Sequence, residues 1–85
     1  MNEMRSAIER ATLDRHPGKQ ALVTDYQRCE KHFAKIAELR REVREAPTAM
    51  MRRAAQVELE MLSLESRTVA ENMAVLEKAM RRHLL

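Results

Sequence analysis

The chain has 85 residues, of which 45% are hydrophobic, 34% are charged and only 2% are aromatic, and it contains one glycine and two prolines. This composition argues against a sheet protein and against a disordered chain, and it favours helices. The 16 basic and 13 acidic residues give a net charge of +3 and alternate along every segment, whereas a dedicated nucleic-acid domain would gather its basic residues on one face.

The single cysteine and the short lengths of the apolar runs bear on the cellular location of the protein. Cys29 has no second cysteine to pair with, so no intramolecular disulfide demands an oxidising environment. No apolar run approaches the roughly 18 residues that span a bilayer. Glu3 and Glu9 interrupt the N-terminal segment where a signal peptide needs an apolar core. We therefore expect a cytoplasmic protein with no membrane contact.

Two breaks divide a single helical domain, residues 1–85, into three predicted helices. The breaks lie at Pro17 and Pro47, because the residue before a proline is biased out of the helical region. The first helix is expected over about residues 3–14 and is too short to be stable without packing. Its apolar face consists of Met4, Ala7, Ile8 and Ala11.

The second helix is expected over about residues 19–45. Its apolar residues recur every three or four positions, which places them on one face and predicts one seam for a neighbouring helix. Leu39 lies beside this seam, next to Arg40. The seam consists of Leu22, Tyr26, Cys29, Phe33, Ile36 and Val43.

The third helix is expected over about residues 48–84, with Pro47 suited to its first turn and Thr48 able to cap it. Because the link to the second helix is only a few residues, the two long helices should form an antiparallel hairpin. The first helix should then cover the C-terminal overhang, with Ile8 near Met80 and Leu84. The residues facing the second helix form a first stripe, Ala55, Leu59, Leu62, Val69, Met73, Leu76 and Met80.

A second stripe on the third helix has no partner within the predicted hairpin. A helix with more apolar face than its own chain can bury usually belongs to an oligomer or docks on another protein. We therefore predict a homodimer, as a helical bundle of two hairpins, or a contact with a different protein. Cover by the first helix and a domain-swapped dimer are the alternatives. The second stripe is Met50, Ala54, Val57, Met61 and Leu64.

The predicted hairpin turn gathers five arginines, which we call the arginine tip. Arginine is well suited to phosphates, so the tip could grip RNA or DNA. Against this, Glu38, Glu42 and Glu45 stand at helical spacing from these arginines and are expected to pair with them. The arginine tip is Arg40, Arg41, Arg44, Arg52 and Arg53.

No residue pattern indicates catalysis or a metal site. Cys29 and His32 have a chelating spacing, but two ligands do not complete a tetrahedral site, so a buried thiol beside a half-exposed histidine is the expectation. His16 and His83 have no matched nucleophile or carboxylate. With one glycine, a phosphate-binding glycine loop is impossible. We predict no enzyme activity, no cofactor and no metal.

Residues 47–85 resemble the last helix of the N-terminal helical domain of bacterial peptide-chain release factors, in the order of the proline, a Met-Arg pair and the terminal Leu-Leu. The likeness covers under half of the chain. The Gly-Gly-Gln tripeptide is absent, so release activity is not implied. In layout the chain also resembles small co-chaperones of type III secretion needle subunits and small phage proteins that disable host factors. The last two likenesses are architectural, carry no residue-level motif and transfer no site.

These observations favour a small protein that acts by stoichiometric binding to another protein, as an adaptor, a co-chaperone or an inhibitor. A nucleic-acid or ribosome-associated factor that uses the arginine tip is the alternative. A purely structural subunit of a larger assembly is the third interpretation.

Overall fold

A computed structural model describes residues 3–14 and 17–84 of the chain. Four helices account for nearly all of these residues, and no strand occurs among them. The prediction of an all-helical fold is therefore confirmed. The helices are α1 (Glu3–Asp14), α2 (Pro17–Glu45), α3 (Ala49–Ser63) and α4 (Ser66–Leu84).

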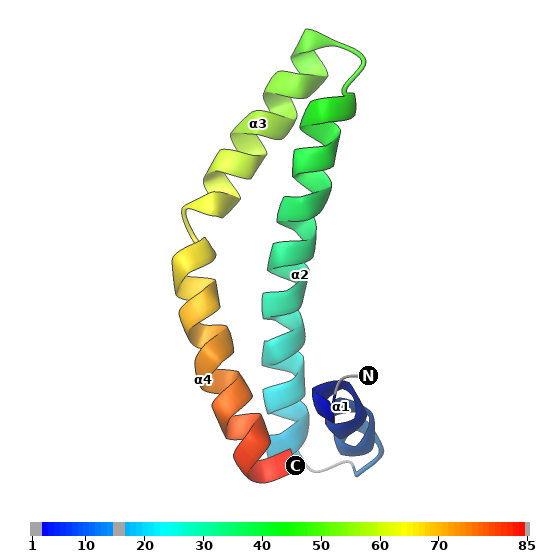
Figure 1. Cartoon of the computed structure of the whole chain (residues 1–85), viewed down its shortest axis with the longest axis vertical. Coiled ribbons are helices and arrows are strands. Elements are labelled where there is room, and N and C mark those ends of the chain that lie inside the picture. The colour runs from blue at the N-terminus through cyan, green and yellow to red at the C-terminus, as the bar shows by residue number, and fades with distance from the viewer. Residues whose placement is uncertain (1–2, 15–16, 85) are drawn as a thin grey trace.

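The molecule is elongated and measures 48 × 22 × 22 Å, and α2 is the helix against which the other three pack. The chain turns back after α2, so that α3 lies along the upper half of α2 and α4 along its lower half (Figure 1). α1 packs against the lower ends of α2 and α4. The two ends of the molecule thus differ, with three helices in contact at one end and only α2 and α3 at the other.

The helix starts follow local chemistry. α2 begins at Pro17, slightly earlier than the spacing predicts, because a proline at the first helical position loses no hydrogen bond and has a suitable φ angle. At the start of α3, the Thr48 side chain accepts a hydrogen bond from the backbone N–H of Met51 at 3.1 Å. Thr48 is therefore the N-cap that the sequence predicts.

The prediction of one continuous helix over residues 48–84 is wrong, because α3 and α4 are separated at Leu64 and Glu65. The N–H of Glu65 bonds to the Leu62 carbonyl at 3.0 Å, a three-residue step, and the four-residue pattern resumes with Val69 bonding to Glu65. Serines stand on both sides of the break, and serine hydroxyls compete with helical hydrogen bonding. The Ser66 hydroxyl instead lies 3.1 Å from Nε2 of His32 on α2.

The break does not turn the first stripe away from α2. Leu62 before it and Val69 after it are both half-buried, since they lie seven residues apart and so return to the same face. Leu39 and Met80 are fully buried, with 0% of their surface exposed. Phe33, predicted in the seam, is 36% exposed and instead stacks edge-on against His32 with ring centroids 5.0 Å apart.

The core is densest where α1 meets α2 and α4. Met4, Val23, Tyr26 and Met80 form a buried cluster there, which we call the Tyr26 cluster. Ile8, Leu84 and three further apolar residues pack against this cluster, as predicted for the overhang. Val23 is outside the predicted seam and is buried because α1 covers a second face of α2.

Tyr26 makes the polar contact of this cluster and provides a test of it. Its hydroxyl donates a hydrogen bond to Oε1 of Glu77 on α4 at 3.1 Å. Burial raises the pKa of the Tyr26 phenol above its ordinary value of 10.0, and the bond to Glu77 adds to the rise. The folded chain therefore holds this proton longer than the unfolded chain does. The stabilisation is complete below about pH 10 and is lost as pH rises through the folded-state pKa.

Tyr26→Phe should lower the free energy of unfolding by about 1 kcal/mol at neutral pH, the usual worth of one hydrogen bond. Above about pH 10 the wild type should lose stability faster than the variant, since only the wild type has a phenol to ionise on unfolding. Urea unfolding across this range measures both effects. Parallel pH profiles for the two proteins would show that the phenol is not perturbed.

Candidate protein-binding surface

The second stripe lies on the exposed side of α3. Met50 is 82% exposed, Leu64 85%, Met61 64% and Val57 45%, and Ala54 is exposed as well. Successive members are four and three residues apart, so they form one continuous row along the helix rather than scattered apolar positions. Of the large exposed apolar residues in the described chain, most belong to this row or flank it; the others are Phe33 and Val75.

The row points away from the rest of the molecule. At 100° per residue it lies roughly 150° around α3 from the face formed by Ala55, Leu59 and Leu62, which packs toward α2. α1 makes no contact with α3 and sits at the opposite end of the molecule (Figure 1). Cover of the second stripe by the described part of the N-terminal helix is therefore wrong. That helix instead covers the Tyr26 cluster, whose apolar residues would otherwise face water.

Charged residues border the second stripe. Arg53 and Glu60 lie on one edge and, with Gln56 and Val57, line a small hollow of about 90 Å³. Met51 and Glu58 lie on the other edge, and both side chains are exposed. An apolar row between charged borders is typical of a helix that docks on another helix.

The arginine tip is exposed throughout, and its predicted pairing is wrong. Among residues 3–14 and 17–84, no ion pair joins a tip arginine to a carboxylate, and Glu38 pairs instead with Lys35 at 3.7 Å. For Arg40 and Arg44 the reason is geometric: at 100° per residue they lie to one side of the buried face of α2, and Glu38 and Glu42 lie to the other. Arg41 stands at helical pairing spacing from Glu38 and Glu45, and no ion pair joins it to either of them.

The described residues contain no group of three His, Cys, Asp or Glu side chains that could hold a metal ion. Cys29 is buried, as expected. His32 is half-buried between Ser66 and Phe33. His83 is exposed at the end of α4, and His16 lies outside the described residues.

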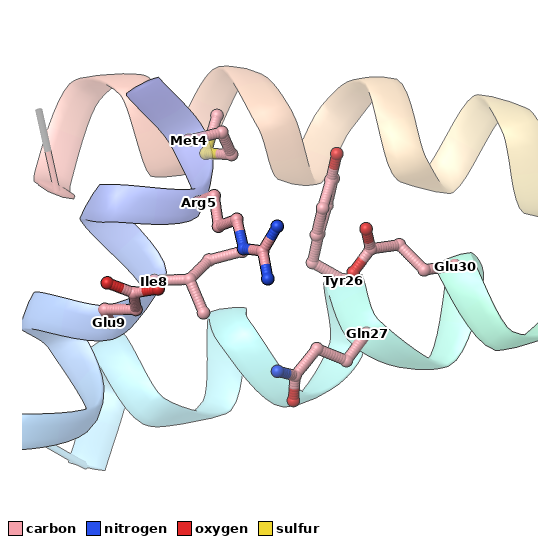
Figure 2. A pocket seen from close by; sticks show the side chains of 7 residues that line it. All are labelled: Met4, Arg5, Ile8, Glu9, Tyr26, Gln27 and Glu30. Carbon is pink, nitrogen blue, oxygen red and sulfur yellow. The ribbon is translucent and has the colours of Figure 1, made fainter. Parts of the chain in front are cut away.

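An open cavity of about 490 Å³ lies where α1 crosses α2. Figure 2 shows the Arg5 guanidinium reaching over it, with the Tyr26 ring rising toward α4 and Glu30 beside it. Its lining combines apolar side chains of the Tyr26 cluster with charged and amide groups at the rim. The hydroxyl of Tyr26, one of its lining residues, is hydrogen-bonded to the Glu77 carboxylate on α4. Its lining residues are Met4, Arg5, Ile8, Glu9, Tyr26, Gln27 and Glu30.

Two positions of interest are not predicted from the sequence. Glu77 accepts the Tyr26 hydrogen bond, but a glutamate on an amphipathic helix gives no signal of its own. Val75 is 68% exposed on α4 and borders a hollow with Cys29 and Leu76. As an apolar residue of the third predicted helix that belongs to neither stripe, Val75 could have been identified as exposed.

No protein-family model, curated protein or solved structure matches this chain. The resemblance of residues 47–85 to a release-factor helix is therefore not supported by these comparisons. In the described part of the chain, no helix is both long and apolar enough to cross a membrane.

Proposed function

We propose that this chain is a small non-enzymatic protein-binding module that acts by stoichiometric contact through the second stripe. Adaptor, co-chaperone and inhibitor are the kinds of activity that such a contact serves. The observation that carries the proposal is that the second stripe remains exposed although α2 has packed against both α3 and α4. A cytoplasmic location stays a prediction from the single cysteine.

The apolar residues of the second stripe are continuous along the helix. Single exposed apolar residues are normal on a protein surface, but a row of them along about four turns is not. Three of the five residues in the row are methionine or leucine, whose flexible or branched side chains fill grooves on a partner helix. Binding would remove this row from water without requiring the described helices to rearrange.

The experiment replaces Met61 and Leu64 together with glutamate. Partner binding should be lost while helix content is unchanged, since both side chains are exposed in the free chain. If the variant still binds the wild-type partner with the same stoichiometry, the second stripe is not the binding surface.

A second candidate function, contact with RNA or DNA, is favoured by one observation. The five tip arginines carry no ion pair with a described carboxylate, so their charges are available to phosphates. Arg40 and Arg44 also share a side of the turn with Arg52, because equivalent sides of two antiparallel helices adjoin. The acidic residues Glu38 and Glu42 lie around the other side of α2.

Changing Arg40, Arg44, Arg52 and Arg53 together to glutamate should abolish retention of RNA or DNA if the tip binds phosphates. Wild-type affinity should also fall steeply with salt, because each neutralised phosphate releases a counterion. Filter binding across a salt series measures both. An affinity that does not change with salt would exclude this second function.

A further inference from the structure

The charges that border the second stripe form a pattern. In the heptad notation of coiled coils, Met50, Val57 and Leu64 occupy d positions, and Ala54 and Met61 occupy a positions. The residue before each a position is a g position, and the residue after each d position is an e position. Arg53 and Glu60 occupy the g edge, and Met51 and Glu58 occupy the e edge. The g edge therefore carries opposite charges one heptad apart, while the e edge within α3 carries one apolar and one acidic residue. Glu65 follows on the e edge, just after α3 ends.

In an antiparallel pair of helices, the g edge of one faces the g edge of the other, and the e edges likewise face each other. Two copies of α3 can therefore place Arg53 of each copy opposite Glu60 of the other. Two-fold symmetry forms this pair twice. On the e edges, Met51 of each copy then lies beside Glu58 of the other, with no like charges opposed.

The same register fills the interior of the contact. Met50 of one copy lies opposite Met61 of the second, and Ala54 lies opposite Val57. Each apolar side chain of α3 in the row therefore faces another apolar side chain across the contact. Leu64, at the break between α3 and α4, falls opposite Pro47 of the second copy, just before α3 begins. Each end of the contact therefore lies where α3 of one copy ends and α3 of the other begins.

Other pairings of two copies oppose like charges. A shift by one heptad in the antiparallel arrangement brings Glu60 against Glu60 and Glu58 against Glu58. A parallel arrangement joins g to e edges; it pairs Arg53 with Glu58 but places Glu60 beside Glu65, so its favourable and unfavourable contacts offset each other. Like charges directly opposed are unfavourable, so the border residues favour one register.

From this charge complementarity we infer that the second stripe binds a second copy of this chain, as an antiparallel α3–α3 pair with Arg53 opposite Glu60. The inference rests on the proposed function, since it names the partner of the same surface. The stripe faces away from α2, so the pair forms without displacing α2. It places α2 and α3 of one copy side by side with α3 and α2 of the other. This layout differs from the compact bundle that the sequence suggests.

The test uses two full-length variants, Arg53→Glu and Glu60→Arg. Each alone opposes like charges at both symmetric contacts and should dimerise about tenfold more weakly than the wild type. When the two variants are mixed, a heterodimer has opposite charges at both contacts, so they should pair with each other at close to wild-type affinity. Sedimentation equilibrium and native mass spectrometry of the separate and mixed chains measure this. Arg52→Glu is the matched control, because it makes the same charge change on the same helix away from the stripe.

Preferential pairing of the two variants supports the inference. It is overturned if the mixture associates no better than the separate variants, or if the wild-type chain stays monomeric at every concentration up to its solubility limit. A monomeric wild type whose second stripe binds a different protein would overturn this inference alone. If replacing Met61 and Leu64 by glutamate affects neither self-association nor partner binding, the proposed function fails too.

Discussion

Leu39→Ala is expected to lower the free energy of unfolding by about 3 kcal/mol, within the range for truncating a fully buried leucine. Leu39 is 0% exposed, in the part of α2 that contacts the returning helices. Alanine is the best helix former, so the change leaves helix propensity intact and isolates the loss of packing. In a domain this small, such a loss is a large part of the total stability.

Urea unfolding followed by circular dichroism measures the effect as a lower midpoint with an unchanged slope. Val75→Ala is the control, since Val75 is 68% exposed and its truncation should change stability by less than about 0.5 kcal/mol. A loss of under about 1 kcal/mol for Leu39→Ala would mean that α2 does not pack as described.

Met61→Glu with Leu64→Glu is expected to weaken association through the second stripe by at least about a hundredfold, because it would bury ionised carboxylates without partners. The unfolding free energy of the monomer should stay nearly constant, since both side chains face water in the single chain. This separation of binding from folding distinguishes an interface residue from a core residue. Analytical ultracentrifugation and thermal unfolding at low concentration measure the two quantities.

The matched control is Ala74→Glu with Val75→Glu, which adds two carboxylates at exposed positions of α4. It should leave association unchanged. If both double variants weaken association equally, net charge rather than the second stripe governs the contact.

Much of the fold could be predicted from spacing alone. The three-four pattern predicted most of the buried faces of α2 and of the returning helices, although Val23 and Leu39 are buried outside the predicted seam and Phe33 within it is exposed. Thr48 marked the start of α3. The placement of α1 over Met80 and Leu84 followed from the overhang. These features depend on interactions between near neighbours or on helix length, both of which are visible in a sequence.

The remaining features depend on tertiary contacts. The first stripe continues through Ser66 without a change of register, so its periodicity gives no sign that the helix breaks at Leu64 and Glu65. The contact of Ser66 with His32 joins positions 34 residues apart in the chain. The expected pairing of Arg40 and Arg44 with glutamates failed because counting charges along the chain overlooked the side of α2 on which each one lies. Nothing in the structure explains why Arg41, on the same side as Glu38, has no ion pair with it. Both the composition of the second stripe and its place on the side of the helix turned away from α2 could be read from the sequence, and the exposure of its residues agrees with this.

The most direct test of the account places a photo-crosslinking amino acid at position 61 of the full chain and, as control, at the exposed position 67 on α4. Irradiation should give a covalent protein adduct of fixed composition from position 61 and none from position 67. An adduct of two copies, with position 61 joined to the segment around Met50, is the predicted product. Equal labelling from both positions, or no protein adduct from position 61, would contradict the claim that the second stripe is a binding surface.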